Sequence, residues 1–131
     1  MRLLTGAFLA LALAFAGSAG AGEERRLSAA EIKVMLSGKT AIGTGEGEGE
    51  GRGYRQYFDP DGSTLYLPDG GRLDSGKWRT DNAKQLYCSW WERGGWSCYE
   101  LYETGEGQVL WRSPGGRDFP ARLVEGKQLS P

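Results

Sequence analysis

Few side chains in this sequence have types and spacing suited to catalysis or metal binding. The chain contains no histidine, and histidine is both the usual general base near neutral pH and the commonest metal ligand. Its two cysteines, Cys88 and Cys98, are not spaced as C-x-x-C and have no obvious activating partner beside them in the sequence. They predict a structural disulfide rather than a redox-active pair or a metal site, and we expect no metal and no cofactor.

The acidic side chains do not form a recognisable catalytic pair. Nothing in the spacing of Asp59, Asp61, Asp69 and Asp74 sets two of them face to face at the roughly 5–9 Å that glycoside hydrolysis needs. The tetrapeptide 59–62 (DPDG) starts like a calcium loop, but the downstream ligands are missing, so it is typical of a plain turn. The nucleophile-elbow, zinc-protease and phosphate-loop motifs are missing as well. We expect no catalytic residue.

Aromatic residues are concentrated in the second half of the chain. Eight of them lie between positions 78 and 111: Trp78, Tyr87, Trp90, Trp91, Trp96, Tyr99, Tyr102 and Trp111. Residues two apart in a strand share a face, so both faces of the segment 86–91 carry a ring and some rings must lie outside the core. Most are expected to be core residues and cross-strand pairs. The functional alternative is an exposed patch of Trp91, Trp96 and Tyr99, suited to a sugar, peptide or protein partner.

One helix is predicted, from Ser28 to about Ser37. Ser28 is a good N-cap, Glu31 three residues later completes a capping box, and Gly38 is a natural stop. The apolar stripe consists of Ile32, Met35 and Leu36. Because so short a helix is marginal alone, we expect its stripe to cover the end or edge of a sheet.

The chain after the helix has the pattern of short strands separated by turns. The expected strands are 40–42, 54–58, 63–67, 73–80, 85–91, 96–102, 109–113 and about 118–124. Such regular turn signals are typical of an antiparallel sandwich or barrel, and a meander of this length tends to close and so remove its exposed edges. We predict a mainly β fold, a small antiparallel up-and-down barrel of about eight strands, lipocalin-like, with one short N-terminal helix. Its interior is expected to be mostly filled, and an open sandwich is the alternative.

The two cysteines fall on consecutive predicted strands. If Trp90 faces Trp96 across this hairpin, the same register places Cys88 opposite Cys98. Directly opposed residues in a non-hydrogen-bonded pair are close enough for a disulfide. Closing this short loop should stabilise the fold by about 2–3 kcal/mol.

The first segment of the chain looks like a cleaved export signal. Arg2 supplies a positive charge, an apolar run follows from Leu3 to Phe15, and Ala19–Ala21 (AGA) fits a cleavage site. The run is shorter than the roughly 20 apolar residues of a membrane-spanning helix, so we expect no stable membrane insertion. Residues 1–21 are predicted to be removed, and residues 22–131 to form a single periplasmic or secreted domain.

The segment 43–53 alternates glycine with other residues and carries glutamate at 46, 48 and 50. It has almost no apolar area to offset the entropy of ordering, so it is predicted to be a flexible, solvated loop. A lid or an acidic cation-binding loop is the alternative, although the segment lacks the rigid oxygen cage of a calcium site.

The charge balance argues against a nucleic-acid partner. The chain has 16 basic and 17 acidic residues, a net charge of −1, and no cluster of lysine and arginine. A nucleic-acid-binding domain is expected to carry a basic face, and attraction to a membrane surface has no better support.

Five segments follow one another in a suggestive order. They are LSAAEIKVMLSGKT, YRQYFDPDGSTLY, GKWRTDNAKQLYCSWW, WSCYELY and VLWRSPGGRDFPARL. The chain resembles small exported bacterial domains of unknown function with a lipocalin-like meander. The resemblance lies in the order of a capped helix ending in G-K-T, a tyrosine strand, a DG hairpin, a G-x-W strand and a paired-cysteine hairpin. The resemblance spans roughly residues 27–124 and implies the architecture but no activity. The Gly–Glu insertion at 44–52 departs from that pattern.

These observations predict an exported, non-enzymatic binding module. Its partner would be an unknown small molecule or an envelope protein, recognised through an aromatic surface or rim that includes Trp91, Trp96 and Tyr99. The alternative is an inhibitor of a secreted hydrolase, in which the polar N-terminal segment or a Gly-rich loop enters the active site. An enzyme ranks third, since it would rely on carboxylates, tyrosine or lysine alone for acid–base chemistry.

Overall fold

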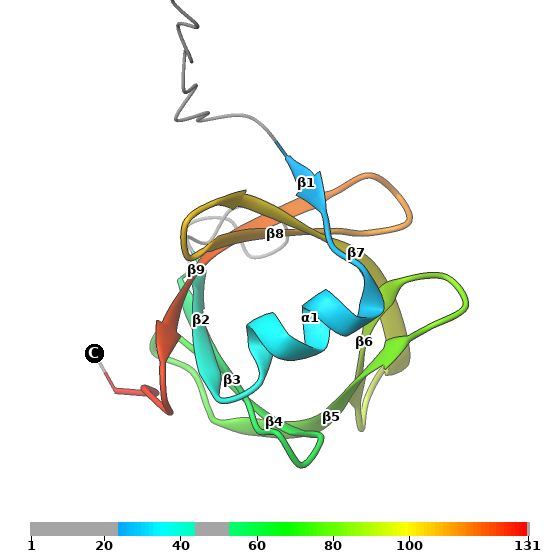
Figure 1. Ribbon diagram of the computed structural model, residues 1–131. Coiled ribbons are helices and arrows are strands. Elements are labelled where there is room, and N and C mark those ends of the chain that lie inside the picture. The colour runs from blue at the N-terminus through cyan, green and yellow to red at the C-terminus, as the bar shows by residue number, and fades with distance from the viewer. Residues whose placement is uncertain (1–23, 44–52, 131) are drawn as a thin grey trace, which may run out of the picture.

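Eight antiparallel strands close into a barrel in the computed structural model, which describes residues 24–43 and 53–130 (Figure 1). In chain order the elements are β1 (Arg25–Arg26), α1 (Ala29–Leu36), β2 (Lys39–Gly43), β3 (Tyr54–Phe58), β4 (Ser63–Pro68), β5 (Asp74–Asp81), β6 (Leu86–Trp91), β7 (Gly95–Gly105), β8 (Gln108–Arg112) and β9 (Asp118–Glu125). The predicted helix and the eight predicted strands are all present. The predicted export segment 1–21 and most of the predicted loop 43–53 lie outside the described residues.

The barrel has the up-and-down order of the predicted meander. Each strand from β2 to β9 pairs antiparallel with the next one along the chain, and β9 pairs back with β2. This closing ladder runs from Lys39 opposite Glu125 to Gly43 opposite Ala121. Closure satisfies the backbone hydrogen-bonding groups that an open sandwich would leave at its edge strands, and the prediction of a barrel is confirmed.

The β3–β4 turn shows how two of the acidic side chains are used. Asp59 Oδ1 accepts a hydrogen bond from the backbone N–H of Asp61 (2.9 Å), and Asp61 Oδ1 accepts one from the backbone N–H of Ser63 (2.8 Å). Gly62 has a φ of 95°, which glycine adopts without steric cost. The DPDG segment is therefore the predicted turn, held by its own carboxylates.

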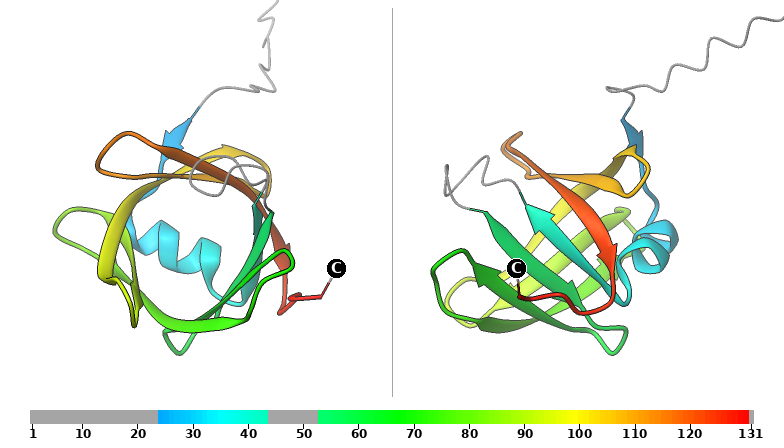
Figure 2. Two further views of the ribbon diagram at one scale, coloured as in Figure 1. Left: turned by 180° about the vertical axis from the view of Figure 1, so that it is seen from behind. Right: turned by 90° about the vertical axis from the view of Figure 1, so that its left-hand side faces the viewer.

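Helix α1 lies across one end of the barrel (Figure 1; Figure 2, right). Ser28 Oγ accepts from the backbone N–H of Glu31 (3.2 Å), and Glu31 Oε1 accepts from the backbone N–H of Ser28 (3.0 Å). This is the predicted capping box, which fixes where the helix begins. Ile32 and Leu36 are fully buried, as is Leu27 just before the helix, so the apolar stripe seals this end of the barrel.

Strand β1 is the element that the sequence did not predict. Arg25 pairs with Glu103 and Arg26 with Tyr102, both on β7. β7 has 11 residues and β6 has six, so part of β7 extends beyond β6 and would leave backbone groups unpaired. β1 pairs with that part, and its formation depends on the available partner rather than on the strand propensity of two arginines.

The part of the barrel beneath α1 is filled by a hydrophobic core centred on Phe58. Phe58 is fully buried, and its ring centroid lies 5.6 Å from that of Trp78, 5.8 Å from that of Tyr87 and 6.0 Å from that of Trp111. Trp78 Nε1 donates a hydrogen bond to the carbonyl oxygen of Asp59 (2.8 Å), so its polar atom is satisfied within the core.

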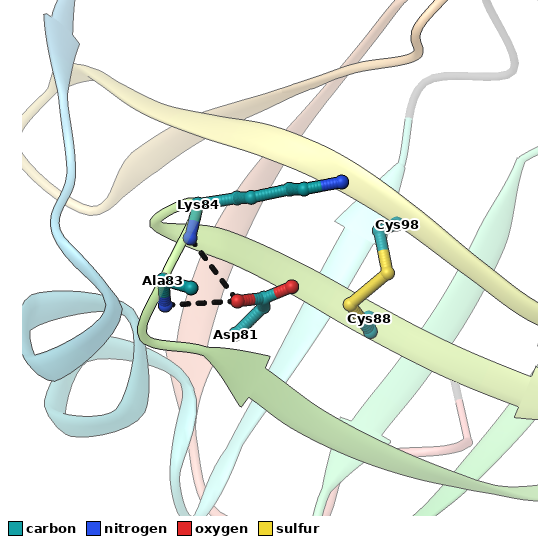
Figure 3. Close-up of a disulfide and its surroundings, with 5 residues drawn as sticks. All are labelled: Asp81, Ala83, Lys84, Cys88 and Cys98. Carbon is teal, nitrogen blue, oxygen red and sulfur yellow. Dashed lines mark hydrogen bonds between the residues drawn. A yellow bond between two sulfur atoms is a disulfide. The ribbon is translucent and has the colours of Figure 1, made fainter.

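A disulfide joins Cys88 on β6 to Cys98 on β7, which confirms the predicted pairing (Figure 3). Trp90 lies opposite Trp96 in the same ladder, which is the register that the prediction assumed. The Cα atoms of the two cysteines lie 4.0 Å apart. The neighbouring β5–β6 turn is held by Asp81, whose carboxylate accepts two backbone hydrogen bonds (Figure 3).

Candidate functional site

The end of the barrel away from α1 contains a cavity of about 410 Å³. Its lining consists of Tyr54, Gln56, Tyr66, Asp74, Tyr87, Ser89, Trp91, Tyr99, Trp111 and Phe119. These side chains come from seven strands, β3 to β9. The sequence led us to expect a mostly filled interior, but the structure fills the part beneath the helix and leaves the other part hollow.

Two glycines at inward positions explain why aromatic side chains leave space between them. A Cβ atom at Gly43 would lie 2.0 Å from Cε1 of Tyr54, and one at Gly76 would lie 2.7 Å from Cε3 of Trp91. Both distances are far below van der Waals contact, so each ring occupies space that any other residue type would take. The rings of Tyr54 and Trp91 therefore lie over glycine backbone at the barrel wall, and they do not fill the centre.

Four residues form what we call the mouth cluster: Tyr54, Tyr66, Asp74 and Trp91. The ring centroid of Tyr66 lies 5.2 Å from that of Tyr54, in a stacked arrangement, and 5.9 Å from that of Trp91, in an edge-to-face arrangement. Asp74 on β5 lies directly opposite Tyr66 on β4. Asp74 is exposed to solvent, so the cavity opens at this cluster.

Deeper in the cavity, hydrogen bonds fix a group of polar side chains. Gln56 Nε2 donates to Thr64 Oγ1 (3.1 Å) and to the Tyr87 hydroxyl (3.1 Å), and Thr64 Oγ1 donates to the carbonyl oxygen of Tyr57 (2.7 Å). Both amide hydrogens of Gln56 are used in this way. The amide is therefore held in one orientation in the cavity wall.

Trp111 carries a buried donor with no partner. Its side chain is 6% exposed, and among residues 24–43 and 53–130 no atom accepts a hydrogen bond from its Nε1. An unsatisfied buried donor costs about 1–3 kcal/mol, and Trp78 shows that this barrel can satisfy an indole N–H when its interior is packed. The ring of Trp111 lines the cavity, whereas its Nε1 atom is buried, so a ligand acceptor would recover that cost only after the indole turns Nε1 toward the cavity.

The cavity is poor in charge. Among residues 24–43 and 53–130, Asp74 is the only carboxylate that lines the cavity, and no lysine or arginine of these residues lines it. Burial raises the pKa of Tyr54, Tyr66 and Tyr87 above the usual range for tyrosine, so these phenols stay neutral at physiological pH. The described lining therefore presents ring faces and neutral hydrogen-bonding groups, together with the negative charge of Asp74 at the mouth.

The structure brings two of the three predicted binding residues together and separates the third. Trp91 and Tyr99 both line the cavity. Trp96 is 41% exposed on the outside of the barrel, where the Arg79 guanidinium lies 4.1 Å from its ring centroid. Trp91 pairs with Gly95, while Trp96 pairs with Trp90, so Trp91 and Trp96 point to opposite faces of the sheet and do not form one patch.

Most of the lining was not singled out from the sequence. The alternation of Tyr54, Gln56 and Phe58 on one strand, with Tyr66 on the next, places them on the same face of the sheet, and this was the available signal. This alternation did not show whether that face would be packed or hollow, because that depends on Gly43 and Gly76 on the neighbouring strands β2 and β5.

Comparison with known proteins adds no assignment. No family model, no curated protein and no solved structure matches the chain. Within residues 24–43 and 53–130, no three acidic or cysteine side chains lie close enough to hold a metal ion. No helix of that part is long and apolar enough to cross a bilayer.

Proposed function

We propose that this protein binds a small molecule inside its barrel, at the end away from α1. The observation that carries the proposal is the cavity of about 410 Å³, whose wall includes the ring of Trp111; the Nε1 donor of this ring is buried and has no hydrogen-bond partner among the described residues. Small-molecule sites commonly have volumes of about 300–1,000 Å³, and they combine mostly apolar walls with a few polar groups that fix orientation. This cavity fits that description.

The lining favours a compact ligand with an apolar body and a hydrogen-bond acceptor. The rings of Tyr99 and Phe119, whose centroids lie 6.3 Å apart edge to face, provide apolar contact opposite the mouth cluster's rings. The acceptor would meet Trp111 Nε1 once the indole turns toward the cavity, and a donor on the ligand would reach the Ser89 or Gln56 side chain.

We propose that the protein is not an enzyme. Among the lining residues, Asp74 has no second carboxylate, histidine or lysine to act with it, whereas acid–base catalysis needs a positioned group that exchanges a proton near the working pH. The raised pKa of the Tyr54 and Tyr87 phenols removes them from that role at neutral pH.

We also propose that the protein acts outside the cytoplasm, as a member of the small exported bacterial domains that its sequence resembles. The Cys88–Cys98 disulfide supports this location, because structural disulfides persist in oxidising compartments. The composition of residues 1–21 supports it independently.

The indole N–H resonances of the five tryptophans provide a direct test. We would titrate the oxidised protein with indole, benzyl alcohol, benzylamine and benzoate and follow the indole signals by 1H–15N NMR. Binding in the cavity should shift the Trp111 signal saturably and leave the Trp78 signal in place, since Trp78 Nε1 is already bonded to Asp59. The proposal fails if none of the four compounds moves the Trp111 signal, or if only the signal of the outward-facing Trp96 moves.

A matched pair of variants locates the binding. Trp111→Phe removes the free donor and keeps a ring, so it should weaken binding of an acceptor such as benzyl alcohol by about fivefold, the value of one hydrogen bond. Trp96→Phe makes the same replacement on the outer surface and should leave binding unchanged. Equal effects of the two variants would argue against a site inside the barrel.

A further inference from the structure

The inner rings of the mouth cluster differ from the rings on the outside of the barrel. On the outer surface, the Arg79 guanidinium lies 4.1 Å from the ring centroid of Trp96, and the Lys77 ammonium lies 5.0 Å from that of Trp90. Within the described part of the chain, no lysine or arginine lies over the faces of the mouth-cluster rings, those of Tyr54, Tyr66 and Trp91. Lysine and arginine side chains of the described residues therefore lie over rings on the outer surface and not over the rings of the mouth cluster.

The ring faces and the carboxylate of the mouth cluster converge. Tyr66 touches Tyr54 and Trp91, and it lies opposite Asp74 in the β4–β5 ladder. The negative face of an aromatic ring attracts a cation, and groups of such rings are the usual means of holding quaternary ammonium groups. The carboxylate of Asp74 in the same cluster is negatively charged, so it attracts the same cation.

Among the described residues, the basic side chains at this end of the barrel do not cancel that attraction. Arg72, Arg93 and Arg117 lie in the β4–β5, β6–β7 and β8–β9 connections, outside the cavity lining. Arg112 on β8 is held by Asp118 (2.7 Å) and Glu24 (3.0 Å). An anionic ligand would therefore meet Asp74 and ring faces at the mouth and no cation within the lining.

We propose, on the basis of the function proposed above, that the ligand is an organic cation. Its ammonium or alkylated ammonium group lies among the rings of the mouth cluster beside Asp74. Its other end lies beside Trp111 and carries a hydrogen-bond acceptor that meets Nε1 once the indole turns toward the cavity. Trp111 stacks on Phe58, at the boundary with the filled core, so the ligand enters with its neutral end first and leaves its charge at the mouth.

Three compounds of nearly the same shape test this orientation and this charge. Choline, 3,3-dimethylbutan-1-ol and 2-hydroxyethanesulfonate share a hydroxyethyl group as the acceptor, and their head groups carry charges of +1, 0 and −1. We would measure their dissociation constants from the Trp111 indole signal by NMR. Choline should bind about five- to thirtyfold more tightly than the neutral alcohol, because cation–π attraction in a partly desolvated site favours the charged head group by that factor, and the sulfonate should bind most weakly.

The results separate the two proposals. If the neutral alcohol binds as tightly as choline, or the sulfonate binds more tightly, the cavity still binds small molecules but the assignment of a cation is wrong. If none of the three binds while benzyl alcohol or indole does, the assignment is also wrong. If no compound of either set shifts the Trp111 signal, both proposals fail.

Two carboxylate variants with the same change of charge provide the control. Asp74→Asn removes the charge in the mouth cluster and should weaken choline binding about threefold, as expected for a solvent-exposed ion pair, without affecting the neutral alcohol. Glu92→Gln removes the same charge from the exposed β6–β7 turn, outside the cavity lining, and should leave choline binding unchanged. Equal weakening by the two variants would mean that the net charge of the protein, and not the mouth cluster, attracts the cation.

Discussion

Replacing one aromatic ring in each part of the barrel tests whether one part is filled and the other hollow. We choose Phe58→Leu in the core beneath α1 and Tyr66→Leu in the mouth cluster. Phe58 is fully buried, whereas Tyr66 is partly exposed and borders the cavity. The two variants make a similar change, from a ring to a branched aliphatic chain, in two different surroundings.

The structure gives the expected magnitudes. Phe58→Leu loses three ring contacts, at 5.6, 5.8 and 6.0 Å, and it leaves a void that the surrounding rings cannot close. Together these effects should lower the free energy of unfolding by about 2–3 kcal/mol. Tyr66→Leu loses two ring contacts, at 5.2 and 5.9 Å, at a site already open to solvent, so its loss should be about 1 kcal/mol.

The assay is urea unfolding of the oxidised proteins, followed by tryptophan fluorescence and analysed with a common slope. Losses for the two variants that agree within about 0.5 kcal/mol would refute the reasoning, because the ring at the mouth would then be packed as tightly as the ring in the core. A loss of unfolding free energy below about 1 kcal/mol for Phe58→Leu would also refute the reasoning, because removing a ring from a filled core should destabilise the fold by more than that.

Three further predictions concern the disulfide, the helix cap and one glycine. Replacing Cys88 and Cys98 together by serine should lower the free energy of unfolding by about 2–3 kcal/mol, and an unchanged urea midpoint would contradict this. Two hydrogen bonds, the stronger from the Ser28 backbone N–H and the other from the Arg25 side chain, lower the pKa of Glu31 from 4.5 to about 2. The contribution of Glu31 to the stability of the fold is therefore complete above about pH 4.5 and is lost as the pH falls toward 2. The melting temperature of Glu31→Gln should therefore fall less steeply than that of the wild type in this window, and parallel curves would argue against the cap. Gly76→Ala should destabilise the fold by about 1–3 kcal/mol, because its Cβ would lie 2.3 Å from a backbone oxygen of β6, whereas Gly94→Ala, with nothing within 4 Å, should leave the urea midpoint unchanged.

The architecture could be predicted from local signals in the sequence. Ser28 and Glu31 mark the helix start, the DPDG segment marks a turn, and a register of Trp90 opposite Trp96 brings the cysteines together. Each of these signals involves residues close in the sequence, whose geometry depends little on the rest of the fold.

The site could not be predicted in the same way, because it depends on which face of each strand points inward. Strand β6 illustrates the difficulty: Ser89 lies inside and Trp90 outside, the reverse of what polarity alone suggests. The alternation defines two faces, but only closure of the barrel decides which one becomes the interior. Similarly, β1 forms because β7 extends beyond β6, and no property of Arg25 and Arg26 themselves indicates this.

The position of α1 has a consequence for how the cavity would exchange its contents. The helix and its buried Ile32 and Leu36 close one end of the barrel, so within the described residues the cavity opens at the other end, where the mouth cluster lies. A ligand that entered past the mouth cluster would leave past it as well, so the mouth cluster would control both the entry and the exit of the ligand. A ligand longer than the cavity would keep its remaining part in solvent, so the barrel would be able to bind the terminal group of a molecule that is much larger than the cavity.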